Sequence, residues 1–423
     1  MKTADLVVKN LSQILTCSGT CPKRKDALQD VGLRENCLIA SHKGRIVFIG
    51  DEREFRKEVK LENDCLTLEG KGLTALPGFI DCHTHLPFAG SREKEFLLRL
   101  KGFTYQQLAG MGMGIQTTVR ATREASQEEL FRLCLKRLDS MLCHGTTTVE
   151  AKSGYGLKLE DEIKQLEVLR QADKNHALDI VPTFMGAHEI PEEYRGKKQA
   201  YINLILDKIM PEVKTRALAE FFDVFCEEGV FSIEETRKLL RAARDEGFKI
   251  KVHADEFTSL GGAELAAEEK AVSAEHLINI SDKGIKKLAQ SETAAVLLPA
   301  VSFFLMLEKK APARKLIDEG AAVALATDFN PGSSMTESML FILQLGVFTL
   351  RMGIEEAINA CTINAAYALR MHDEVGSLEE GKKMDLILFD FPSFASLVYH
   401  LGVNPIKHVI KNGKIVVWNG NIR

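Results

Sequence analysis

Between residues 76 and 326 the chain repeats one pattern eight times: a short apolar run typical of a buried β-strand, followed by a segment with helical periodicity. The eight runs are 76–80, 146–149, 180–184, 221–225, 249–252, 272–274, 294–298 and 321–326. Ser126 and Ser232 each begin a Ser-x-x-Glu pattern that marks a helix start between runs. Repeated β-then-α units favour an α/β fold, a (β/α)8 TIM barrel. The rival is a doubly wound open sheet, which is weakened because no Gly-rich phosphate-binding pattern follows any run.

Both ends of the chain alternate short β-type runs with turns. Near the C-terminus, Asn412-Gly413 stands between two apolar runs, and this dipeptide is typical of a tight hairpin turn because both residues tolerate positive φ. We predict that the two ends pair into one small β-sandwich. The predicted division gives residues 1–72 and 371–423 to the β-sandwich and residues 73–370 to the barrel.

The composition indicates an ordinary globular chain of 423 residues, 45% hydrophobic and 27% charged, with a net charge of -4. This balance gives no sign of a nucleic-acid or membrane partner. The one compact basic cluster, Lys23-Arg24-Lys25, is too short to bind a polyanion, and we expect a solvated loop there. The start is not of signal-peptide type, no apolar window approaches ~20 residues and the nine cysteines are scattered, so we expect a cytoplasmic protein.

The groups that carry chemistry in a TIM barrel follow the strands, so the C-terminal ends of the eight runs are the places to look. Five of the eleven histidines fall there: His83, His85, His188, His253 and His276. Asp328 follows the eighth run, and imidazole with carboxylate is a ligand set that suits Zn²⁺ or Fe²⁺. We predict that His83, His85, His253 and Asp328 hold a metal ion. For any one of them alone the alternative is structural: a hydrogen-bonded histidine, or a helix cap in the case of Asp328.

These strand ends resemble the amidohydrolase superfamily, and longer stretches resemble, within it, the imidazolonepropionase family. The stretches are PGFIDCHTHLPFAGSREKEF, VEAKSGYGL, FMGAHEIPEEY, DVFCEEGVFS, HADEF, LLPAVSFFL and ALATDFNPGS, with NAAYAL and VGSLEEGKKMDL further on. The resemblance implies one catalytic metal per chain, Zn²⁺ or Fe²⁺/Fe³⁺. Relatives with two metals carry a bridging residue, often a carboxylated lysine, after the fourth strand. Here that place holds Glu227, and a bridging Glu227 stays open as an alternative.

The resemblance also implies a reaction: hydrolysis of the ring C–N bond of 4-imidazolone-5-propanoate to N-formimidoyl-L-glutamate by a metal-activated water. Asp328 or Glu256 is expected to take the proton of the water, and Glu256 to deliver one to the departing ring nitrogen. His276 is expected to hold the water or to stabilise the oxyanion. Arg92 matches the arginine that binds the propionate carboxylate. The other predicted substrate contacts, beside Glu256, are Tyr155, His188, Asn330, Gly332 and Ser333.

Two other functions remain open from the sequence. A mononuclear amidohydrolase that deaminates a guanine- or cytosine-like base would use the same metal and acid–base set but would not need Arg92. A non-catalytic relative could use the barrel as a scaffold, although such proteins typically lose the ligands that this chain retains. We expect a small-molecule substrate in either enzyme and, by analogy with other barrel enzymes, a homodimer.

Overall fold

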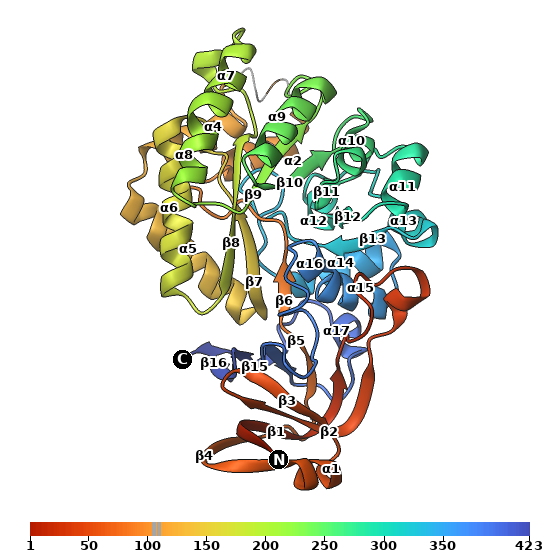
Figure 1. Cartoon of the computed structure of the whole chain (residues 1–423). Helices are drawn as coiled ribbons and strands as arrows, with labels where there is room; N and C mark the ends of the chain where they lie inside the picture. Colours follow the sequence, from red (N-terminus) through yellow and green to blue (C-terminus); the bar gives the residue numbers. More distant parts are fainter. Residues whose placement is uncertain (104–106, 108–110) are drawn as a thin grey trace.

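The computed structural model describes residues 1–103, 107 and 111–423. In this part of the chain eight parallel strands form a barrel surrounded by helices, and a mixed sheet of nine strands lies below one end of the barrel (Figure 1). We call it the smaller sheet because it belongs to the smaller of the two parts of the molecule. Both termini lie in the smaller sheet (Figure 1). The barrel strands are β6 (Phe79–Asp81), β7 (Thr146–Lys152), β8 (Asp179–Ala187), β9 (Phe221–Cys226), β10 (Lys249–Ala254), β11 (Ser273–His276), β12 (Ala294–Leu297) and β13 (Ala322–Leu325).

The barrel strands pair with their neighbours in chain order, from β6 to β13. The first and last strands meet just beyond their ends, where Thr84 and Phe329 form a parallel bridge. The backbone N–H of Asp328 donates to the carbonyl of His83 at 3.0 Å, and the N–H of His85 donates to the carbonyl of Phe329 at 3.0 Å. These bonds close the sheet, which confirms the predicted TIM barrel and excludes the open doubly wound sheet.

The first predicted run, 76–80, is divided between the two sheets. Its first half belongs to β5 (Thr74–Pro77), which pairs with β14 (Leu386–Phe389) in the smaller sheet, and its second half forms β6 of the barrel. The division falls at Gly78, where an added Cβ would lie 2.1 Å from the Oγ1 of Thr147. Only glycine allows this close approach. One apolar run therefore joins the two parts of the molecule.

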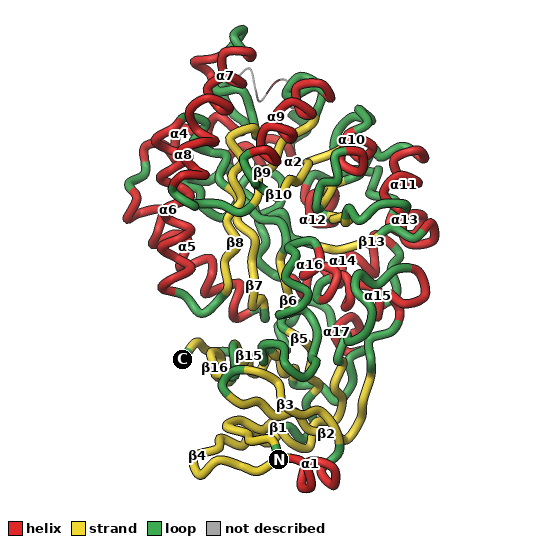
Figure 2. Tube along the Cα trace, in the orientation of Figure 1, coloured by secondary structure: helices red, strands yellow, loops and turns green. Residues whose placement is uncertain are grey.

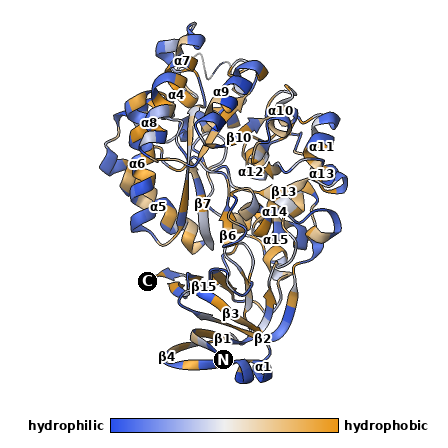
Figure 3. Cartoon of the chain, viewed as in Figure 1, coloured by the Kyte–Doolittle hydropathy of each residue, from blue (hydrophilic) through white to orange (hydrophobic). Residues whose placement is uncertain are grey.

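Amphipathic helices cover the outside of the barrel, and the hydropathy colouring alternates along α5 and α6 (Figure 3). As the sequence predicts, the hydroxyl of Ser126 accepts from the backbone N–H of Glu129 at the start of α5, and Ser232 forms a complete capping box with Glu235 at the start of α9. No helix in the described residues is both long enough and apolar enough to cross a membrane. The helices outside the smaller sheet are α2 (Glu93–Leu100), α4 (Ile115–Glu124), α5 (Gln127–Cys143), α6 (Leu159–Asn175), η2 (Glu192–Tyr194), α7 (Lys198–Leu204), η3 (Ile205–Ile209), α8 (Met210–Thr215), α9 (Ile233–Asp245), α10 (Gly262–Glu268), α11 (Asp282–Ala289), α12 (Pro299–Phe304), α13 (Ala313–Glu319), α14 (Met339–Leu350), α15 (Ile354–Ala360), α16 (Ile363–Tyr367) and α17 (Ser396–Tyr399).

The smaller sheet combines strands from the two ends of the chain, as expected for the β-sandwich (Figure 2). It has an apolar core of its own. The predicted hairpin turn is present, with Asn412 at φ 49° and Gly413 at φ 72°. The division at residues 72/73 and 370/371 stays a proposal, and the sheet itself continues to Pro77. The remaining elements of this part are β1 (Lys2–Leu15), η1 (Lys25–Gln29), β2 (Leu33–His42), β3 (Arg45–Gly50), α1 (Glu52–Glu58), β4 (Val59–Glu69), β15 (Ile406–Lys411), β16 (Lys414–Trp418) and β17 (Asn421–Ile422).

In the basic cluster near the N-terminus only Lys25 is exposed, as the sequence suggests, whereas Lys23 and Arg24 pack against other parts of the molecule. Lys23 is only 2% exposed, and its backbone N–H donates to the side chain of Asn364 at 2.8 Å. Arg24 donates to the carbonyls of Ala289, Ser291 and Gly320 on the barrel. The segment was misread because basic side chains that satisfy main-chain carbonyls of another domain leave no local sequence signal.

Candidate metal centre and active site

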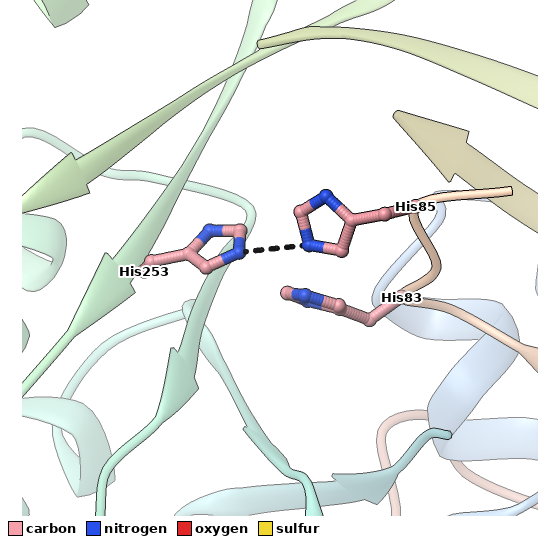
Figure 4. Close-up of side chains that lie close together, drawn as sticks. All are labelled: His83, His85 and His253. Carbon is pink, nitrogen blue, oxygen red and sulfur yellow. Dashed lines mark hydrogen bonds between the residues drawn. The ribbon is translucent and has the colours of Figure 1, made fainter. Parts of the chain in front are cut away.

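The predicted metal ligands come together at the C-terminal ends of the barrel strands. His83 and His85 follow β6, His253 lies in β10, and Asp328 follows β13. All four side chains are nearly completely buried, with at most 3% of the residue exposed. The imidazoles of His83, His85 and His253 converge from two strands on one small volume (Figure 4).

The distances between these side chains are those of a potential metal site. One ligand atom from each of His83, His85 and His253 lies within 4.8 Å of the others, and the same holds for His83, His276 and Asp328. The Nε2 atoms of His85 and His253 are 3.4 Å apart (Figure 4). The Oδ1 of Asp328 lies 3.2 Å from the Nε2 of His83 and 3.3 Å from the Nε2 of His85.

The donor set fits a borderline cation. His83 Nε2 and Asp328 Oδ1 are buried and have no well-formed hydrogen bond, which is costly unless something else satisfies them. Asp328 also adopts φ 50°, an uncommon conformation for a residue other than glycine. Imidazole nitrogen and carboxylate oxygen are ligands that Zn²⁺ and iron accept, so these residues fit the metal that the sequence predicts.

The pKa shifts of these residues agree with a role as metal ligands. Burial lowers the pKa of His85 and holds that of His253 well below its usual value, so both rings are neutral, the form that ligates metal. Burial raises the pKa of Asp328, but the adjacent imidazoles of His83 and His85 outweigh it and hold the pKa well below its usual value. Burial also lowers the pKa of His83, but the Glu275 carboxylate outweighs it and raises the pKa to about 9, so a cation that binds His83 displaces a proton.

Glu256 and His276 lie beside the metal set. The Nε2 of His276 is 3.5 Å from the Oε2 of Glu256, and both residues are buried. Burial first, and then the charge of Asp328, raise the pKa of Glu256 well above its usual value, which favours the protonated form of this carboxyl group. Burial lowers the pKa of His276 well below its usual value and leaves the ring uncharged. A proton donor and a neutral imidazole thus face the same site.

Glu227, the candidate bridge for a second metal, has a different use in the structure. Its Oε2 accepts from the backbone N–H of Phe257 at 2.9 Å, and its Oε1 accepts from the hydroxyl of Thr258. Both carboxylate oxygens are therefore engaged by the loop that carries Glu256. Glu227 therefore stabilises the position of that loop.

The aromatic residues that we expect to contact the substrate, His188 and Tyr155, lie next to His85. The ring of His188 stacks on that of His85, with centroids 4.8 Å apart and planes 20° apart. Tyr155 lies 5.9 Å from His85 and 5.3 Å from His188, centroid to centroid. Burial raises the pKa of Tyr155, while the charge of Arg92 lowers this pKa and that of Asp328 raises it.

Arg92 is held in place by a carboxylate of its own chain. Its Nε donates to Glu95 Oε2 at 2.9 Å and its Nη2 donates to Glu95 Oε1 at 2.5 Å. Nη1 instead faces Gly332, where an added Cβ would lie only 2.1 Å from it. The structure therefore brings Arg92 and Gly332 together and leaves one edge of the guanidinium outside the Glu95 pair.

Asn330 and Ser333 shape the loop that contains Gly332. The Oδ1 of Asn330 accepts from the backbone N–H of Gly332 and of Ser333, at 2.8 and 2.9 Å. Its Nδ2 donates to the carbonyl of Asp328 and to the hydroxyl of Ser333. The amide of Asn330 is thus committed to its own loop, and this loop connects Asp328 with the Arg92 side of the site.

The sequence analysis missed a buried ionic cluster beneath the histidines. It contains Glu150 and Lys152 of β7, Asp223 of β9, Lys251 of β10 and Glu275 of β11, all 0% exposed. Their signal was available: charged residues occupy inward positions of otherwise apolar strands, as in the alternating pairs Glu150/Lys152 and Lys251/His253.

The comparisons with known proteins agree with the geometry. A family model described as "Amidohydrolase family" matches residues 74–416. Imidazolonepropionases of Alkaliphilus oremlandii and Clostridium tetani are 49% and 48% identical to the chain, over 99% and 98% of its length and 99% of theirs. That of Treponema denticola is 52% identical over 84% of this chain and 86% of its own.

Solved structures share the fold at low sequence identity. An adenosine deaminase from Xanthomonas campestris with bound zinc has a TM-score of 0.73 at 17% identity, covering 100% of this chain and 95% of its own. A triazine hydrolase variant has a TM-score of 0.75 at 15% identity, covering 99% and 95%. From the barrel, the histidine and aspartate set and the match across its length, the chain belongs to the metal-dependent amidohydrolase family and, within it, to the imidazolonepropionases.

Proposed function

We propose that the chain hydrolyses the ring C–N bond of 4-imidazolone-5-propanoate and releases N-formimidoyl-L-glutamate. The observation that carries this proposal is the convergence of three imidazoles and one carboxylate on one buried volume, with Glu256 and His276 next to it. The relatives named imidazolonepropionase, which match nearly the whole chain, support the choice of substrate.

His83, His85, His253 and Asp328 would hold the metal, which we propose to be one Zn²⁺ or iron ion per chain. When bound, such an ion lowers the pKa of a water molecule toward neutrality and polarises a carbonyl group. A single ion is favoured because the second acidic group that could take a cation, around Asp223 and Glu275, already contains the ammonium of Lys152.

The acid–base steps follow from the two carboxyl groups. Water adds to the ring carbonyl carbon, and its proton passes to Asp328, the carboxylate that the histidines keep ionised. The bond between that carbon and the ring nitrogen then breaks, and Glu256 gives its proton to the leaving nitrogen. His276 lies within 3.5 Å of Glu256 and orients the water or stabilises the oxyanion.

Arg92 would bind the propionate carboxylate through the edge that faces Gly332. Tyr155 and His188 flank His85 and would contact the ring, while Gly332 and Ser333, in the loop shaped by Asn330, would contact the carboxylate formed by ring opening. A homodimer and a cytoplasmic location stay predictions.

The test is incubation of the purified chain with freshly prepared 4-imidazolone-5-propanoate, with and without a chelator. We expect loss of the imidazolone absorbance and formation of formimidoylglutamate, both abolished by metal removal and restored by Zn²⁺ or Fe²⁺. Parallel samples with cytosine and guanine are assayed for ammonia. Ammonia release from a base without turnover of the imidazolone would replace the proposal by a deaminase, and no turnover of any of them by metal-loaded protein would reject it.

A further inference from the structure

The buried ionic cluster has Lys152 at its centre. The Nζ of Lys152 lies 2.7 Å from Glu150 Oε1, 2.9 Å from Asp223 Oδ2 and 3.4 Å from Glu275 Oε2. One ammonium therefore contacts carboxylates from three different strands, β7, β9 and β11. Lys251 reaches Glu275 at 3.0 Å but has no such contact with Asp223.

Two of these carboxylates contact the predicted metal ligands. Asp223 Oδ1 lies 3.1 Å from the Nδ1 of His253, and Glu275 Oε2 contacts the Nδ1 of His83. A carboxylate at Nδ1 fixes the tautomer and the orientation of an imidazole and leaves its Nε2 free for a metal. In His83 and His253 it is Nε2 that faces the other ligands.

The third carboxylate holds the backbone between the first two ligands. Glu150 Oε2 accepts from the N–H of Thr84 at 3.2 Å, and the hydroxyl of Thr84 donates to the carbonyl of Glu150 at 2.7 Å. The backbone N–H of Lys152 donates to the carbonyl of Thr84 at 2.9 Å. The segment from His83 to His85 is thus fixed to the end of β7 by side chains and backbone together.

We propose that Lys152 is a positioning residue for the metal centre: its ammonium holds Glu150, Asp223 and Glu275 together and through them sets the directions of His83, His85 and His253. Three carboxylates that are 0% exposed repel one another, and burial of such charges is tolerated only when they are paired. Without the ammonium, repulsion between the carboxylates turns Asp223 and Glu275 away from the Nδ1 atoms of His253 and His83, and the two imidazoles lose the charged neighbours that orient them. The inference rests on the proposed metal set but assigns a role outside it.

The experiment measures cation affinity directly. The metal-free chain and its Lys152→Met variant are titrated with Zn²⁺ in competition with a chromophoric chelator, and with Co²⁺, whose visible absorption reports ligand geometry. We expect Zn²⁺ to bind roughly 10–100-fold more weakly to the variant, in line with the loss of other residues that orient metal ligands. The Co²⁺ spectrum should also change. Wild-type affinity together with a wild-type Co²⁺ spectrum would overturn the proposal.

Lys411→Met is the matched control. Lys411 is likewise 2% exposed and pairs with two carboxylates, Asp385 at 2.6 Å and Asp179 at 2.7 Å, but it lies in β15 of the smaller sheet. This variant should lose stability in urea unfolding and keep its Zn²⁺ affinity within about twofold of wild type. An equal loss of affinity in both variants would mean that general destabilisation explains the effect, and would overturn the role of Lys152.

A second variant decides the matter if Lys152→Met does not fold. Asp223→Asn keeps the side-chain volume and removes the charge that Lys152 holds next to His253, so its Zn²⁺ affinity should fall in the same range. If it does not, the proposal fails. Absence of Zn²⁺ binding in the wild-type chain would contradict the proposed function, whereas normal binding in wild type and in both variants would contradict only the role of Lys152.

Discussion

Replacing Gly332 by alanine tests the proposed carboxylate site through one methyl group. The new Cβ would lie 2.1 Å from Arg92 Nη1 and 2.8 Å from Arg92 Cζ. Non-bonded heavy atoms settle at about 3.5–4.0 Å, so the guanidinium must move by at least about 1 Å. The backbone at Gly332 does not have positive φ, so the alanine itself adds no strain there.

This movement of the Arg92 guanidinium should weaken binding of the substrate's propionate carboxylate. Glu95 holds two nitrogens of Arg92, so the guanidinium leaves either this pair or its place beside the substrate. A misplacement of about 1 Å can cost roughly 100-fold in rate, so we expect kcat/KM to fall by about 10–100-fold, or about 1.4–2.7 kcal/mol. Most of the loss should appear in KM, because a remote carboxylate is bound equally in the ground and transition states.

Steady-state kinetics with the imidazolone and with a ring analogue that lacks the carboxylate give the measurement. The analogue should react equally well with wild type and variant. Gly353→Ala is the matched control, since its Cβ would meet Glu356 only at an ordinary 3.6 Å. An unchanged KM for the imidazolone, or equal changes for the two compounds, would refute the argument that Arg92, placed against Gly332, binds the propionate carboxylate.

Three further predictions follow from the same structure. Glu256→Gln should keep the metal content and lower turnover by about two or more orders of magnitude, because the proton donor is lost; near-normal turnover would remove Glu256 from the mechanism. Thr327→Val deletes a 2.6 Å hydrogen bond to the fully buried carboxylate of Asp81. The free energy of unfolding in urea should fall by about 1–3 kcal/mol. An unchanged urea midpoint would show that this hydrogen bond does not support barrel closure. Burial raises the pKa of Asp179, but Lys411 outweighs it and lowers the pKa, so the stability from this pair is present above about pH 4 and is lost as the pH falls further. The difference in urea midpoint between wild type and Asp179→Asn should therefore be larger at pH 6 than at pH 3, and a difference independent of pH would contradict the ion pair's contribution.

The barrel and its candidate metal ligands could be predicted from the sequence because their signals are local. Eight apolar runs separated by helical patterns specify strands and helices one at a time, and a barrel places the residue after each strand at one end. His83, His85, His253 and Asp328 were identified from their places in this pattern, and the structure brings their side chains together. The hairpin at Asn412 and the helix starts at Ser126 and Ser232 follow from equally local rules.

Closure of the barrel decided what the local pattern leaves open. The pattern of a strand predicts which side chains point inward. It does not predict that Lys152 lies close to Asp223 and Glu275, because these residues meet only when β7, β9 and β11 surround one interior. The pairing of Arg92 with Glu95 beside Gly332, and the burial of Lys23 against Asn364, likewise depend on segments that meet only in the folded chain. Contact energies between charged groups change steeply with distance and with exclusion of water, and both are properties of the packed molecule. The sequence therefore determined which residues stand at the site, and the tertiary structure decided which neighbours hold them there.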